Sequence, residues 1–127
     1  MSCIFCDIDN RPEEDIVFRN ELVLFLHNGK HQGALKHSGL IIPIAHRETA
    51  FDLTPQEIAA TFELLSEVKT HMDREFGPDG YNLGWNCGKV AGQRIFHAHM
   101  HVIPRFTQEP LAGVGIRDYL KSEANAW

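Results

Sequence analysis

The spacing of apolar and polar positions divides the chain into several short strands and one long helix. Five segments have the short apolar or alternating pattern that is typical of strands: 16–19, 22–26, 40–44, 81–86 and 95–103. The polar pair Asn20-Glu21 separates the first two segments, which favours a hairpin. The third segment is β-branched and contains Pro43, so we expect a strand that is covered on both faces.

A helix is predicted from Pro55 to about residue 76. Thr54 can cap the free amides of its first turn, Pro55 suits the first helical position, and Glu57 completes a capping box. Gly77 follows as a stop signal. Apolar residues recur at spacings of three and four and are expected to form one core-facing stripe: Ile58, Phe62, Leu65, Val68, Met72 and Phe76.

Together these elements predict a single α+β domain over residues 1–127. It should hold a mainly antiparallel sheet of about five strands, one long helix and a short C-terminal helix near an amphipathic piece at 116–121. No apolar run is long enough to cross a membrane. The start of the chain lacks the basic and apolar regions of a signal peptide, so we expect a cytoplasmic protein.

The net charge of −5 argues against nucleic acid or an anionic membrane surface as a partner, because both attract an excess of Lys and Arg. A small phosphate site with a local positive field remains compatible with this charge.

Three histidines, His97, His99 and His101, alternate along the last predicted strand and would therefore lie on one face. The residues between and beside them are apolar and are expected to face the core: Phe96, Ala98, Met100 and Val102. A row of solvated imidazoles is one interpretation, and a metal site is another. We favour a catalytic row, because a neutral imidazole is nucleophilic towards phosphorus at neutral pH and its neighbours can move protons.

The sequence around these residues resembles the histidine-triad (HIT) family. Residues 91–105, AGQRIFHAHMHVIPR, resemble the family signature His-φ-His-φ-His-φ-φ, where φ is apolar. The likeness extends to residues 80–88, to the Ile-Pro-x-x-His pattern that ends at His46, and to the opening Cys-Ile-Phe-Cys of bacterial members. The resemblance implies a homodimer with a shared sheet of about ten strands and a purine nucleotide as substrate.

By the same resemblance, His99 would carry a nucleotidyl group between two half-reactions that cleave a phosphoanhydride or phosphoramidate bond. His101 would contact the phosphate oxygens, and His97 would help to orient His99, whose other ring nitrogen would meet a carbonyl of a neighbouring strand. Substrate contacts are expected from Asn86 and from two residues of the following loop, Gln93 and Arg94. Arg105, after the final Pro, is expected to serve structure or a partner rather than chemistry.

Cys3 and Cys6 form a C-x-x-C pair, which by itself indicates half a metal site, a redox motif or two free thiols. The resemblance adds His46 and His97 as the remaining ligands of a structural Zn²⁺ site. No organic cofactor is implied.

The sequence departs from the family pattern in several places, and the departure that bears most on function is at the expected ribose site. Many members have an acidic, ribose-binding residue where this chain has His27, followed by Asn28. Either side chain can bond a ribose hydroxyl, but neither supplies a carboxylate. This departure favours the main alternative, a nucleotide-binding or scaffold protein with little catalytic activity.

Overall fold

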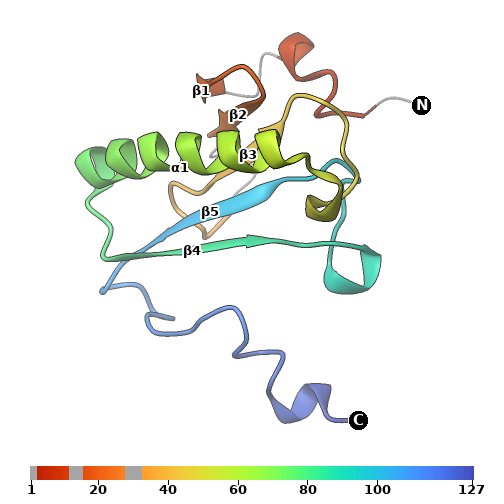
Figure 1. Ribbon diagram of the computed structural model, residues 1–127. Coiled ribbons are helices and arrows are strands. Elements are labelled where there is room, and N and C mark those ends of the chain that lie inside the picture. The colour runs from red at the N-terminus through yellow and green to blue at the C-terminus, as the bar shows by residue number, and fades with distance from the viewer. Residues whose placement is uncertain (1–2, 12–15, 28–32) are drawn as a thin grey trace.

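A five-stranded antiparallel sheet, crossed on one face by a single long helix, forms the framework of the protein (Figure 1). A computed structural model describes residues 3–11, 16–27 and 33–127. The strand order is β1-β2-β3-β5-β4, with these bounds: β1 Ile16–Arg19, β2 Val23–Leu26, β3 Gly39–Pro43, β4 Gly80–Trp85 and β5 Met100–Arg105. Helix α1 spans Pro55–Phe76. The α+β class and the hairpin of β1 and β2 are thus confirmed.

Within the described residues, short 3₁₀ helices join or follow these elements: η1 Ile8–Asn10, η3 Ala50–Asp52, η4 Lys89–Ala91 and η5 Glu123–Asn125. The predicted amphipathic piece at 116–121 forms turns, so the short C-terminal helix is η5, a few residues later. In the described part of the chain, α1 included, no helix combines the length and the apolar character needed to cross a membrane.

The ends of α1 follow their sequence signals. The Thr54 side chain accepts a hydrogen bond from the Glu57 amide, and the Glu57 carboxylate accepts one from the Thr54 amide. Gly77 ends the helix in the left-handed conformation, with φ of 60°, which a residue without a side chain adopts at little cost.

The buried face of α1 is rotated from the predicted stripe. Ala60, Leu64, Val68 and Met72 face the sheet, whereas Phe62 is 54% exposed. Leu65 packs at the margin of the buried cluster, where it is partly exposed. The prediction of Phe62 as a core residue was therefore wrong, while Met72 is fully buried as expected.

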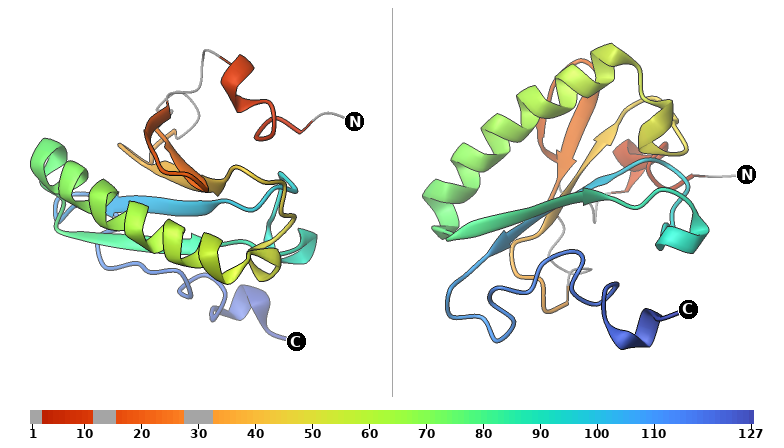
Figure 2. Two further views of the ribbon diagram at one scale, coloured as in Figure 1. Left: turned by 45° about the horizontal axis from the view of Figure 1, so that its top comes forward. Right: turned by 60° about the horizontal axis from the view of Figure 1, so that its bottom comes forward.

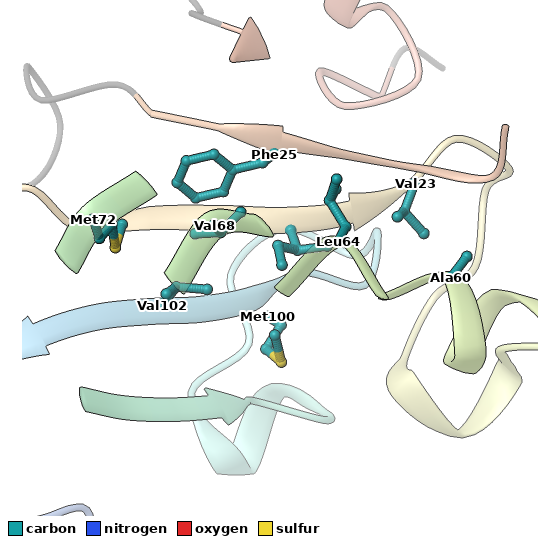
Figure 3. Packing of buried hydrophobic residues seen from close by; sticks show 9 residues of the cluster. Val23, Phe25, Ala60, Leu64, Val68, Met72, Met100 and Val102 are labelled. Carbon is teal, nitrogen blue, oxygen red and sulfur yellow. The ribbon is translucent and has the colours of Figure 1, made fainter. Parts of the chain in front are cut away.

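Two apolar clusters sandwich the inner strands. Val23 and Phe25 of β2 pack against α1 together with Met100 and Val102 of β5, as Figure 3 shows. On the other face of the sheet, the alternate β2 side chains pack with Phe5 and Ile8 of the N-terminal segment. β2 and β3 are therefore packed on both faces, whereas β5 is packed on the α1 face and lines a pocket with its other face.

The histidine strand starts later than predicted. β5 begins at Met100, and residues 95–97 form a bend, so His97 and His99 precede the strand. The Ala98 amide donates to the Arg47 carbonyl at 2.6 Å instead of joining the sheet. Phe96 is 43% exposed, contrary to the prediction that it faces the core. The predicted alternation, with histidines on one face and core-facing apolar residues on the other, therefore fails before Met100.

A buried ion pair supports this bend from the start of α1. Glu57 is 3% exposed and accepts a hydrogen bond at 2.9 Å from Nε of Arg47, the residue whose carbonyl holds Ala98. Burial alone would raise the pKa of Glu57, but hydrogen bonds from the Thr54 amide and from Arg47 outweigh it and lower that pKa.

Glu57→Gln is expected to reduce the free energy of unfolding by about 2 kcal/mol at pH 7, because a charge-assisted hydrogen bond is lost. A carboxyl whose pKa is lowered by folding stabilises the protein above its unfolded pKa, and this contribution disappears as pH falls through the folded pKa. The variant should therefore differ most from the parent above about pH 4.5 and converge with it in more acidic solution. Urea unfolding at several pH values, with the exposed Glu63→Gln as control, measures this; parallel pH profiles would contradict it.

Candidate functional site

His99 is positioned by the backbone of its own segment. Its Nδ1 lies 2.8 Å from the carbonyl oxygen of His97. A carbonyl only accepts, so Nδ1 carries the proton and Nε2 keeps its lone pair. Sequence reasoning expected a carbonyl from a neighbouring strand; the bend at 95–97 explains why the carbonyl comes from two residues earlier. The ring is 9% exposed and rests edge-on against Phe5, at a centroid distance of 5.4 Å.

His101 lies beside His99, with ring centroids 5.1 Å apart. Burial lowers the pKa of His101, and the neighbouring His99 lowers it further, which favours a neutral ring at neutral pH. His101 also lines a pocket of about 300 Å³ together with Asn86 of the loop after β4. The structure therefore brings His99, His101 and Asn86 to one end of the sheet, on the face opposite α1.

Gln93 has a different environment from the one its sequence position suggests. The side chain is 2% exposed. Its amide oxygen accepts from the Gly88 amide at 2.8 Å, and its amide nitrogen donates to the Glu48 carbonyl at 2.6 Å and to the Ile95 carbonyl at 3.1 Å. These bonds fix the loop before the histidines, so in this state Gln93 acts as a positioning residue, and a phosphate contact stays a prediction.

The three remaining predicted substrate contacts, His27, Asn28 and Arg94, have different environments. His27 packs against Phe25 and Phe76, on the side of the sheet that α1 covers. Asn28 lies outside the described residues. Arg94 is exposed next to the buried Gln93, where it is free of the protein core.

Four side chains from distant parts of the chain form a candidate metal centre. One ligand atom from each of Cys3, Cys6, His46 and His97 lies within 4.8 Å of the others. Cys6 Sγ is 3.2 Å from His46 Nδ1, and Cys3 Sγ is 3.4 Å from His97 Nδ1. Tetrahedral bonds of about 2.0–2.3 Å place ligands about 3.3–3.8 Å apart, so the group has the dimensions of a four-coordinate site.

The protonation state of His97 suits a metal ligand. Its Nε2 lies 2.8 Å from the Pro43 carbonyl and must donate to it, which leaves the Nδ1 lone pair directed at the two thiols. Burial is the main cause that lowers the pKa of His97, with His46 and His99 adding to it, so the ring stays neutral. A neutral imidazole and thiols are the donors that bind soft or borderline metals.

The metal centre and the triad share one residue. The His97 ring belongs to the four-ligand group, while the His97 carbonyl accepts the His99 hydrogen bond. The sequence patterns and the family resemblance named the side chains of both groups. They did not reveal the Pro43 carbonyl that orients the His97 ring or the Arg47 carbonyl that holds the Ala98 amide, because a backbone group leaves no signature in residue type.

An open antiparallel sheet that carries three histidines at the start of an inner strand defines the histidine-triad class of protein. The HIT domain family matches residues 10–108 of this chain. The chain therefore belongs to the HIT domain family.

Three similar proteins illustrate the relationship. A HIT family protein from Bacillus anthracis has 34% identity and a TM-score of 0.79, covering 99% of this chain and 86% of that one. A Zn-bound histidine-triad family protein from Mycobacterium smegmatis has 27% identity and a TM-score of 0.73, covering 93% and 85%. The adenosine 5′-monophosphoramidase hnt1 of Schizosaccharomyces pombe is 32% identical, covering 94% of this chain and 86% of that protein.

Proposed function

We propose that this protein is a hydrolase or transferase that cleaves a phosphoramidate or phosphoanhydride bond of a purine nucleotide through a nucleotidyl-histidine intermediate. One observation carries the proposal: the hydrogen bond from His99 Nδ1 to the His97 carbonyl leaves Nε2 as a free nucleophile. The name of the S. pombe relative, a monophosphoramidase, supports the same bond type.

The proposed reaction has two steps. In the first, the Nε2 lone pair of His99 forms a bond to phosphorus while the bond from phosphorus to the leaving nitrogen or oxygen breaks with its electron pair, and the leaving group takes up a proton. In the second, water attacks phosphorus, its proton is released, and the bond to Nε2 breaks to give the nucleoside monophosphate and free His99. The Asn86 amide can donate to the phosphate oxygens as charge develops on them.

Intact-protein mass spectrometry after brief mixing with adenosine 5′-phosphoramidate tests the proposal. Quenching at high pH preserves phosphohistidine, which is labile in acid. A transient added mass of one adenylyl group, with release of AMP, is the expected result. Bound nucleotide with neither adduct nor AMP would refute it and favour the nucleotide-binding or scaffold alternative, which the absence of a carboxylate at His27 motivates.

We further propose that the four-ligand group binds a structural Zn²⁺ ion. The two thiols and two imidazoles match the donor set of structural zinc sites, and four protein ligands leave no position for a substrate. A bound ion would join the N-terminal segment to the segment that carries His99. The reducing cytoplasm, where we expect this protein, keeps such thiols available.

A homodimer is the third part of the proposal. β4 is an edge strand of the sheet, and beside it lies a mainly apolar groove of about 330 Å³. Its lining residues are Phe62, Leu65, Tyr81, Leu83 and Val102, together with Ser66 and Lys69. An unpaired edge next to exposed apolar side chains gains by pairing with a second copy across a two-fold axis.

Phe62→Arg is therefore expected to convert a dimer into a monomer, because it replaces an apolar contact by a second positive charge beside Lys69. Sedimentation velocity measures the change. Phe51→Arg is the matched control, since Phe51 is exposed in η3 and lies outside the groove. Equal sedimentation of parent and both variants would contradict this interface.

A further inference from the structure

The pocket beside His101 is walled in part by the C-terminal segment, which the sequence did not connect with the site. The pocket residues come from β4, β5, the loop before β3 and this segment: Leu35, Asn82, Leu83, Gly84, Trp85, Asn86, His101, Ile103 and Ile116. Gly84 pairs with His101 in the sheet, and Ile116 lies over Gly84, with its Cδ1 3.6 Å from the position that a Cβ at residue 84 would take. The run of chain after β5 is visible beside β4 in Figure 2.

Arg105 holds this segment in place. Its guanidinium donates to the carbonyl of Leu111 at 2.9 Å and to the carbonyl of Val114 at 2.7 Å, and also to the side chains of Asn82 and Glu109. Strand β4 and the segment are thus tied to the end of β5 by one side chain. Ile116 follows the last of these contacts by two residues, so Arg105 fixes where it reaches the pocket.

The pocket is mainly apolar, and the polar side chains of its described lining, Asn82, Asn86 and His101, include no carboxylate, ammonium or guanidinium group. Among the described residues that line it, none is Lys, Arg, Asp or Glu, and burial lowers the pKa of His101. A leaving group with several negative charges would lose its hydration here without gaining an ion pair. An apolar substituent would instead gain contacts with Leu35, Ile103 and Ile116.

A leaving group needs a proton when its bond to phosphorus breaks, and His101 is the one side chain of this described lining that is suited to relay it. This requirement favours the leaving group over the nucleoside as the occupant of the pocket. Resting on the function proposed above, we propose that Ile116, positioned by Arg105, is a specificity-determining residue that selects leaving groups with an apolar, uncharged substituent over polyphosphates.

The test compares two substrates that share the adenylyl group: adenosine 5′-phosphoramidate, which releases ammonia, and its N-benzyl derivative. Ile116→Ala is expected to lower kcat/KM for the benzyl derivative about tenfold, the usual effect of lost apolar contact in a pocket. The unsubstituted substrate should be unaffected. Leu120→Ala, an equally exposed apolar truncation in the same segment, serves as control and should change neither value.

Arg105→Lys keeps the charge but removes the planar fork that makes the four contacts. Arg105→Lys should also lower kcat/KM for the benzyl derivative selectively. The double variant with Ile116→Ala should lower this kcat/KM no more than either single variant, because both substitutions act through one contact. An independent, additive loss would mean that Arg105 does not act through Ile116.

The outcomes distinguish a failure of the proposed function from a failure of the assignment of Ile116. If the parent protein turns over neither substrate, the proposed function fails and this inference fails with it. If the parent turns over both, and Ile116→Ala changes both equally or neither, only the assignment of Ile116 is overturned. A change that instead depends on the nucleobase, measured with the guanosine analogue, would place the nucleoside in this pocket and also overturn it.

Discussion

His99→Ala is expected to abolish the nucleotidyl adduct and to reduce turnover of adenosine 5′-phosphoramidate on the order of 10⁴-fold, the scale of loss when an enzyme loses its nucleophile. The hydrogen bond from Nδ1 to the His97 carbonyl aims this ring and frees Nε2, and in the proposed mechanism no other group makes the bond to phosphorus. Binding of AMP should be nearly unchanged, because the proposed role of His99 is to form the bond to phosphorus during the reaction. Steady-state kinetics and isothermal titration calorimetry separate these two effects.

His71→Ala is the matched control, since His71 packs against Phe18 and Phe76 away from the triad. Its activity should equal that of the parent. His101→Ala should slow formation of the adduct without preventing it. An adduct of normal size in the His99 variant would assign the nucleophile to another residue.

Replacing Cys3 and Cys6 together by serine is expected to release the metal and to lower the melting temperature by roughly 10–20 °C. A ligand present at about 1,000 times its dissociation constant contributes about 4 kcal/mol, and a domain of this size loses several degrees per kcal/mol. The change should be large because the metal would tie the N-terminal segment, with Phe5 and Ile8, to the sheet. Calorimetry and elemental analysis of the purified protein measure both quantities.

Cys87→Ser controls for general effects of losing a thiol, since Cys87 lies outside the four-ligand group. It should melt like the parent and keep its metal. A parent that contains no metal and melts like the double variant would show that the two thiols are free.

Local sequence signals predicted the elements of the fold well wherever a few neighbouring residues decide the structure. The Thr54–Glu57 capping box and the Gly77 stop gave the ends of α1 because these groups bond within one turn. The buried face of α1 was harder to predict from the sequence. Phe62 and Leu64 are both apolar, and only the position of the sheet decides which of them is buried.

In the candidate site too, the sequence predicted the residues but not their geometry. The side chains of His97, His99 and His101 were recognisable from their order, but their geometry was not, because a bend replaces the predicted strand at 95–97. That bend depends on a hydrogen bond from Ala98 to Arg47, across 51 positions of sequence. The wall formed by Ile116 also escaped prediction, because nothing near Ile116 indicates which strand it will meet.

The shared role of His97 also bears on how the protein is made. Cys3 and His97 are 94 positions apart, so a metal bound by the four-ligand group would close a loop that spans most of the chain. A nascent chain presents the two thiols early, but it has no complete ligand set until the triad segment has left the ribosome. Long-range contacts form after local ones. Metal binding and the positioning of the His97 carbonyl that holds His99 should therefore occur together, late in biosynthesis. A chain interrupted before His97 should have neither the metal site nor this carbonyl contact.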